Sequence, residues 1–134
     1  MTFELTMLFW VATTLFVLMI MQGALTPITQ GFAWGLGSRD TPQEPSVLQG
    51  RMTRIVANHI EGMLVFAALV IVAHLGGISS SLTELGAALY LGARIVFALV
   101  YMAGVPVLRS AVWGVSALGI GLIAFEILTA SVPA

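Results

Sequence analysis

The sequence predicts an all-α membrane protein, a bundle of four transmembrane helices in one domain that covers residues 1–134. The chain is 59% hydrophobic and only 8% charged, with a mean hydropathy of +1.04, whereas an ordinary globular domain carries about 25% charged residues. It has no cysteine, and its net charge of −1 includes no basic block. Composition therefore excludes disulfides, thiolate metal sites and a protein-borne thiol nucleophile, and it argues against nucleic-acid binding.

The first expected helix is the apolar run Leu5–Leu25, which carries no charge and is long enough to cross a bilayer. We expect it to be retained rather than cleaved as a signal peptide, because it lacks a basic start and its uncharged stretch continues to Ser38. The long polar connection Thr26–Gln49 should follow it.

The second helix is expected to begin after Ser46, whose hydroxyl suits an N-cap, and to run to about Leu75. After a short turn, Ser81 or Thr83 should cap the third helix, which runs to about Gly104. Because this turn is short, the second and third helices should be antiparallel neighbours.

The fourth helix is expected from Ser110 to about Val132, after a break at Pro106. The chain has no lysine, and four of its five arginines fall at the side of the first and third connections: Arg39, Arg51, Arg54 and Arg109. The positive-inside rule then places both termini outside the cell and the polar loops in the cytoplasm.

A polar stripe enters the second helix at membrane depth. Arg51, Arg54, Asn58 and Glu61 follow one another at steps of three, four and three residues, which places them on one helical face. Charged groups in a membrane are costly and usually face a bundle interior or a cavity. The stripe is therefore the first candidate for a binding site.

The third helix carries a matching stripe of Tyr90, Arg94, Phe97 and Tyr101. Arg94 lies near mid-span, where an unpaired charge would be expensive. Counted from the short turn, Arg94 and Glu61 differ in depth by only about 6 Å at ~1.5 Å per residue. We therefore expect Arg94 to approach Glu61, within or between subunits, or else a tyrosine.

Each of these polar residues also has a purely structural interpretation. A buried ion pair of Arg94 and Glu61 can simply fix helix register, and Asn58 can join two helices by hydrogen bonds. Arg51 and Arg54 can extend to the membrane surface without binding anything. The convergence of two stripes favours a polar cavity over these alternatives.

Other polar residues carry weaker signals. His59 points away from the stripe and suits a packing or interfacial role, while Glu4 and Glu126 near the outer helix ends are expected to be solvated. Trp113 and the other tryptophans suit interfacial or lipid-facing positions. No acidic or cysteine cluster accompanies His59 and His74, so no metal site is expected.

The segment Arg54-Ile-Val-Ala-Asn58-His-Ile-Glu61 resembles the signature of the MAPEG family, the membrane-associated proteins of eicosanoid and glutathione metabolism. The third-helix segment Arg94-Ile-Val-Phe97-Ala-Leu-Val-Tyr101 matches the pattern of the same family. Arg109-Ser110 resembles the Arg-Ser of its prostaglandin E synthase branch. The resemblance covers nearly the whole chain and is closest to the bacterial members, which implies a bacterial inner-membrane location.

The resemblance implies a homotrimer with glutathione bound between subunits near the cytoplasmic side. It also implies which residues bind the tripeptide: Arg51, Arg54, Asn58, Glu61, Arg94 and Tyr101. Arg109, followed by Ser110, would stabilise the thiolate. A free thiol has a pKa of about 8.5, and a nearby guanidinium favours the nucleophilic thiolate.

Two classes of function stay open. One is a microsomal-type glutathione S-transferase or peroxidase that acts on lipophilic electrophiles or lipid peroxides drawn from the membrane. The other is a non-enzymatic subunit that keeps the family bundle and packs against a partner protein. A small transporter is disfavoured, because no broken helix or internal repeat is evident.

Overall fold

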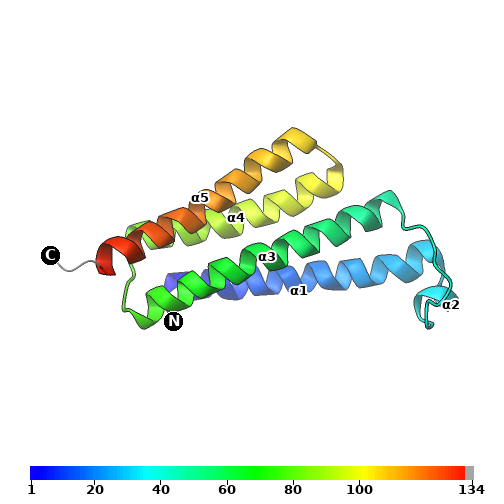
Figure 1. Cartoon of the computed structure of the whole chain (residues 1–134), viewed down its shortest axis with the longest axis horizontal. Coiled ribbons are helices and arrows are strands. Elements are labelled where there is room, and N and C mark those ends of the chain that lie inside the picture. The colour runs from blue at the N-terminus through cyan, green and yellow to red at the C-terminus, as the bar shows by residue number, and fades with distance from the viewer. Residues whose placement is uncertain (132–134) are drawn as a thin grey trace.

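The structure, a computed structural model, describes residues 1–131 as an antiparallel array of long helices (Figure 1). Four of the described helices are long and apolar enough to cross a membrane: α1 (Phe3–Gln30), α3 (Val47–Leu75), α4 (Ser81–Ala103) and α5 (Pro106–Ser131). The predicted four-span bundle is confirmed, and the chain is an integral multi-pass membrane protein.

The helix α1 extends past the expected end at Leu25 and includes Pro27 before it ends at Gly31. The length of an apolar run predicts the part of a helix that crosses the membrane, but α1 continues beyond its apolar run into the polar connection. The short helix α2 (Phe32–Gly35), which the sequence did not predict, folds back so that the backbone of Gly35 packs directly on Pro27. A Cβ at Gly35 would lie 2.6 Å from the Pro27 Cα.

The helix boundaries follow from capping chemistry. Ser46 caps α3 as predicted and forms a capping box with Gln49. The cap of α4 is Ser80, so the expectation of Ser81 or Thr83 was wrong; the Thr83 hydroxyl oxygen instead accepts a hydrogen bond from the Ser80 backbone N–H.

The helix α5 begins at Pro106 rather than Ser110. Proline favours the first position of a helix, where its missing N–H costs nothing, so Pro106 marks the start of the helix rather than a break before it. The expected end near Val132 lies outside the described residues.

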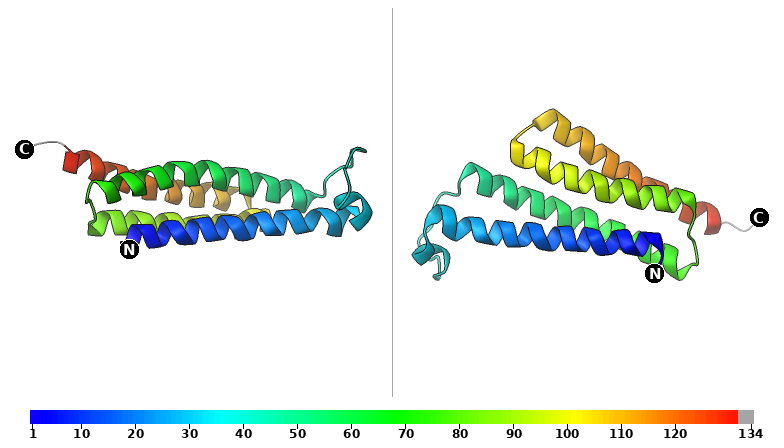
Figure 2. Two further views of the ribbon diagram at one scale, coloured as in Figure 1. Left: turned by 90° about the horizontal axis from the view of Figure 1, so that it is seen from below. Right: turned by 180° about the vertical axis from the view of Figure 1, so that it is seen from behind.

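The helices pack as two hairpins (Figure 2). The helix α4 packs most extensively on α5, and α1 packs on both α3 and α4. One apolar core contains Val11, Phe66 and Tyr90, and a second lies closer to the polar loop around Met52 and Ile55. The contact of α3 with α4 and α5 is looser, and the polar stripes face this seam.

A buried carboxylate fastens α1 to α4 at the end opposite the polar loop. Glu4 is only 2% exposed and accepts hydrogen bonds from the hydroxyls of Ser79 and Thr83. The expectation that Glu4 is solvated was therefore wrong, because α4 supplies the hydroxyl donors that a buried carboxylate needs. Glu126 is partly exposed.

The α4–α5 hairpin depends on a contact between two glycines. A Cβ at Gly119 would lie 2.6 Å from the Gly86 carbonyl oxygen, and a Cβ at Gly86 would lie equally close to the Gly119 carbonyl oxygen. Small residues of this kind allow membrane helices to approach closely.

We therefore expect Gly119→Ala to destabilise the fold by about 1–3 kcal/mol, because rigid backbone must move to accept the methyl group. Gly121→Ala is the matched control on the same helix, since nothing lies within 4 Å of its added Cβ; it should be neutral or gain up to ~1 kcal/mol from helix propensity. Thermal unfolding in detergent, followed by circular dichroism, measures both. Equal melting temperatures for the two variants would contradict the close contact.

Candidate functional site

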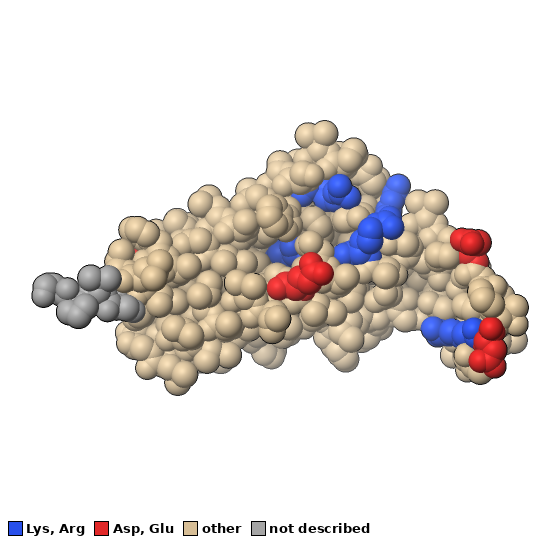
Figure 3. All heavy atoms as spheres, in the orientation of Figure 1, with Lys and Arg blue, Asp and Glu red and all other residues tan. Residues whose placement is uncertain are grey.

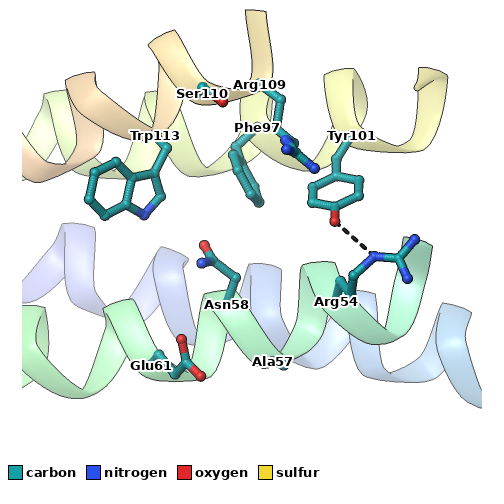
Figure 4. Close-up of a pocket in the computed structure, with 9 residues that line it drawn as sticks. All are labelled: Arg54, Ala57, Asn58, Glu61, Phe97, Tyr101, Arg109, Ser110 and Trp113. Carbon is teal, nitrogen blue, oxygen red and sulfur yellow. Dashed lines mark hydrogen bonds between the residues drawn. The ribbon is translucent and has the colours of Figure 1, made fainter. Parts of the chain in front are cut away.

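The two polar stripes meet in one pocket of about 450 Å³ between α3 and the α4–α5 hairpin, called here the main pocket (Figure 4). Its lining comes from three helices: Arg54, Ala57, Asn58, Glu61, Phe97, Tyr101, Arg109, Ser110 and Trp113. The shared helical faces deduced from the sequence thus do line a cavity. The helix α3 supplies the acid and the amide, α4 supplies aromatic rings, and α5 supplies the Arg109-Ser110 pair.

Tyr101 lies between two arginines in the main pocket. Its hydroxyl accepts a hydrogen bond of 2.9 Å from Arg54 Nε, and the Arg109 guanidinium lies 4.6 Å from the centre of its ring. The first contact ties α3 to α4, and the second ties α5 to α4. Tyr101 therefore sets the positions of two cations from different helices around one space.

Arg94 is buried near the middle of α4, with 1% of its surface exposed. Its Nη1 donates a 2.8 Å hydrogen bond to Asn58 Oδ1, and its guanidinium lies 4.7 Å from the centre of the Phe97 ring. The expected pairing with Glu61 is wrong for the chain as described; the alternative, a tyrosine, holds only as proximity, since the Tyr90 hydroxyl and Arg94 Cζ both border the space beside Gly62 without a hydrogen bond between them. The side chain instead meets Asn58, three residues closer to the polar loop, and leaves Glu61 exposed at the pocket.

A second cavity of about 270 Å³, the deep pocket, adjoins the main pocket and shares Asn58, Glu61 and Trp113 with it. Gly62 makes room here, since a Cβ would lie 2.7 Å from the Tyr90 hydroxyl. Among the described residues, that hydroxyl and the Nε and Nη2 of Arg94 have no hydrogen-bond partner.

A third cavity of about 230 Å³, the arginine pocket, lies on the polar-loop side of Tyr101. It contains Arg51, Arg54 and Arg109 together with the α4–α5 turn. Arg51 is thus brought beside the main pocket but not into it. Its Nη1 donates a 3.0 Å hydrogen bond to the Met102 carbonyl oxygen near the end of α4.

Positive charge dominates the three adjoining pockets. Their linings contain four arginines and one glutamate, a net charge of +3, and no salt bridge joins Glu61 to any of them within residues 1–131. Figure 3 shows these cations gathered around a hollow on one face, beside an acidic side chain. Such a surface favours an anion that also carries one positive group.

Two residues that line the main pocket, Trp113 and Ala57, were not among the predicted site residues. Trp113 walls the main and deep pockets instead of facing only lipid, and Ala57 contributes a small apolar patch. Trp113 lies four residues after Arg109, which places both on one face of α5, so its spacing was the available signal. His59 is fully buried, as a packing role requires. No group of three metal-ligating side chains gathers in the part of the chain that the structure describes.

The comparison with known families returned one match. The model of the MAPEG family matches residues 7–129, a span that contains every residue of the three pockets. No curated protein and no solved structure gave a significant match.

The Arg94–Asn58 contact can be tested by a double-mutant cycle. Asn58→Leu should destabilise the fold by about 1.5–3 kcal/mol, because it leaves a buried cation without its acceptor. The same change made together with Arg94→Met should lower the stability of the fold by much less, because both polar partners are then gone. Circular dichroism melts of the four proteins in detergent give the coupling energy. Strictly additive effects would show that the contact does not contribute to stability.

Proposed function

Because the chain belongs to the MAPEG family, we propose that it binds glutathione and uses its thiol against lipophilic electrophiles, as a membrane transferase or peroxidase. The observation that carries this proposal is the set of four arginines and one glutamate around adjoining pockets in the membrane. Glutathione carries two carboxylates and one ammonium, so its charges complement this set.

Recognition of the tripeptide follows from the chemistry of each group. Arginine suits carboxylates because its planar guanidinium can bind both oxygens at once; Arg54 and Arg94 are the proposed partners. Glu61, exposed at the pocket without an ion-pair partner among the described residues, would accept hydrogen bonds from the ammonium. Asn58 and Tyr101 would complete the contacts with the peptide backbone.

Arg109 is the proposed activator of the thiol. The described chain gives it a ring contact with Tyr101 but no carboxylate, so its charge is available to a thiolate. A guanidinium beside the sulfur lowers the pKa of the thiol and raises the fraction of nucleophile. The Ser110 hydroxyl, which donates to the Pro106 carbonyl oxygen, lines the same wall and is the proposed second contact of the sulfur.

The reaction then needs only the thiol and the electrophile. With an aryl halide, the thiolate forms a carbon–sulfur bond and halide leaves. With a lipid hydroperoxide, the thiolate attacks the terminal oxygen and the O–O bond breaks, which gives a sulfenic acid and an alkoxide that takes up the proton lost by the thiol. A second thiol reduces the sulfenic acid to a disulfide and water.

The electrophile would come from the bilayer. Phe97, Trp113 and Ala57 give the main pocket apolar walls beside its cations, and the surrounding helices expose apolar side chains to lipid. We further propose a homotrimer, the assembly general in the family. The polar-loop end, which holds Arg39, Arg51, Arg54 and Arg109, would face the cytoplasm of a bacterial inner membrane, with the termini outside.

The function is tested by measuring glutathione binding to the purified protein in detergent, together with turnover of an aryl halide and a lipid hydroperoxide. Saturable binding and thiol-dependent turnover of either substrate would support the enzyme. Failure to bind glutathione or any other low-molecular-weight thiol would overturn the proposal and favour a non-enzymatic subunit that packs against a partner protein.

The role of Arg109 makes the sharpest prediction. Arg109→Ala should lower turnover by about 10²–10³-fold, the scale of removing one group that stabilises developing charge, while thiol binding weakens much less. Ultraviolet titration of the bound thiolate should show a raised thiol pKa in the variant.

Arg54→Ala is the matched comparison, because its proposed role is to bind a carboxylate and its loss should act mainly on thiol affinity. If Arg109→Ala leaves both the thiol pKa and turnover unchanged, Arg109 is only a membrane-surface anchor beside the α4–α5 turn.

A further inference from the structure

The arginine pocket contains Arg51, the one of the four pocket arginines to which the proposed recognition of the tripeptide assigns no group. Its lining contains Arg51, Arg54 and Arg109 and no acidic residue. Glu61, which lines both other pockets, is absent from it. Of the many N–H donors on these three guanidinium groups, two donate to acceptors within residues 1–131, the Met102 carbonyl and the Tyr101 hydroxyl. A concentrated positive charge with unused donors is thus held in about 230 Å³.

The α4–α5 turn is shaped to hold Arg51 in this position. Gly104 adopts a left-handed backbone with φ of +79°, and a Cβ there would lie 2.6 Å from Arg51 Nη2 and 2.8 Å from its Cζ. A Cβ at this position would require the flexible end of Arg51 to shift, and the positive φ independently favours glycine. Arg51 is therefore seated against the turn, rather than extended freely toward the membrane surface.

The surroundings favour an anion at this place. Pro106, the first residue of α5, and Val105 just before it border the pocket, and the N-terminus of a helix attracts negative charge. Arg51 offsets the opposite charge at the end of α4 by bonding to the Met102 carbonyl. The pocket also borders the α4–α5 turn, between two helices long enough to span a membrane, and the ends of such helices reach the headgroup region.

We infer that Arg51, Arg54 and Arg109 form a binding site for a phosphate group at the membrane interface. One arginine can satisfy both oxygens of a planar carboxylate, whereas a tetrahedral phosphate presents oxygens in several directions and suits three guanidinium groups that surround it. At this depth the expected source is an anionic phospholipid headgroup; free inorganic phosphate has the same chemistry.

This inference does not depend on thiol chemistry, although the two sites adjoin. Arg54, Tyr101 and Arg109 line both the arginine pocket and the main pocket, so a bound phosphate would set the positions of two cations of the proposed thiol site. Because phosphate binding is measured without thiol or electrophile, the site can exist even if the proposed enzyme activity does not, and the reverse also holds.

The test is isothermal titration of the full chain in a neutral detergent with short-chain phosphatidylglycerol, short-chain phosphatidylcholine and inorganic phosphate. Arg51→Gln is the informative variant, since Arg51 lines the arginine pocket but not the main pocket. Arg39→Gln is the matched control: it removes another loop-end arginine, one that bonds to the Gly35 carbonyl and lies over the Trp34 ring. Circular dichroism checks that both variants are folded.

We expect phosphatidylglycerol to bind more tightly than phosphatidylcholine, and Arg51→Gln to weaken it by about tenfold or more while Arg39→Gln leaves it unchanged. Equally tight, Arg51-dependent binding of inorganic phosphate would support the phosphate site and identify a free anion as its source. Absence of binding by all three probes, or equal losses in the two variants, would overturn the inference. If Arg51→Gln does not fold, Arg51→Lys should fold and still weaken binding, because lysine keeps the charge but lacks the planar guanidinium that can bind two oxygens at once.

Discussion

The arrangement of the polar residues depends on the free-energy cost of burying one cation, the guanidinium of Arg94. Arg94 has 1% of its surface exposed in the middle of a spanning helix, where an unpaired charge is expensive. Its hydrogen bond to Asn58 joins α4 to α3, and these helices otherwise pack loosely. Once Asn58 is held at this depth, the period of α3 places Arg54 and Glu61 one turn away on either side, and the pockets follow from that register.

The sequence was sufficient for the spans and for the faces. The four spans, the Ser46 cap of α3 and the lining by Arg54, Asn58 and Glu61 were all predictable. Each depends on a local feature of the sequence: a long apolar run, a capping hydroxyl or the spacing of polar residues along a helix. The start of α5 at Pro106 could have been predicted from the preference of proline for the first helical turn. The end of α1 could not, because its last turns pack against α2 through the contact of Gly35 with Pro27, which no local pattern specifies.

The hydrogen-bond partners of the buried charged groups could not be predicted from the sequence. Depth counting brings Arg94 near Glu61, yet which acceptor a long side chain meets depends on its rotamer and on the neighbouring helix, and here the acceptor is Asn58. Glu4 followed the same logic: only the approach of α4 turned an expected surface carboxylate into a buried one. The spacing of Trp113 from Arg109 places both residues on one face of α5, but whether that face turns toward α3 depends on helix packing, which the sequence pattern of α5 does not determine.

The glycine contact between α4 and α5 has a mechanical consequence. Because the α4 and α5 backbones touch at Gly86 and Gly119, these two helices form one closely packed hairpin, which carries Arg94, Tyr101 and Arg109. A second hairpin, which includes α3, carries Arg54, Asn58 and Glu61. Within the described chain, side-chain hydrogen bonds join the two hairpins at Arg51–Met102 and Arg54–Tyr101 near the polar loop and at Asn58–Arg94 near the middle of α4. At the opposite end, Glu4 of α1 accepts a hydrogen bond from Thr83 of α4. A ligand that bonds to both hairpins would therefore link them across the seam where α3 packs most loosely on α4 and α5.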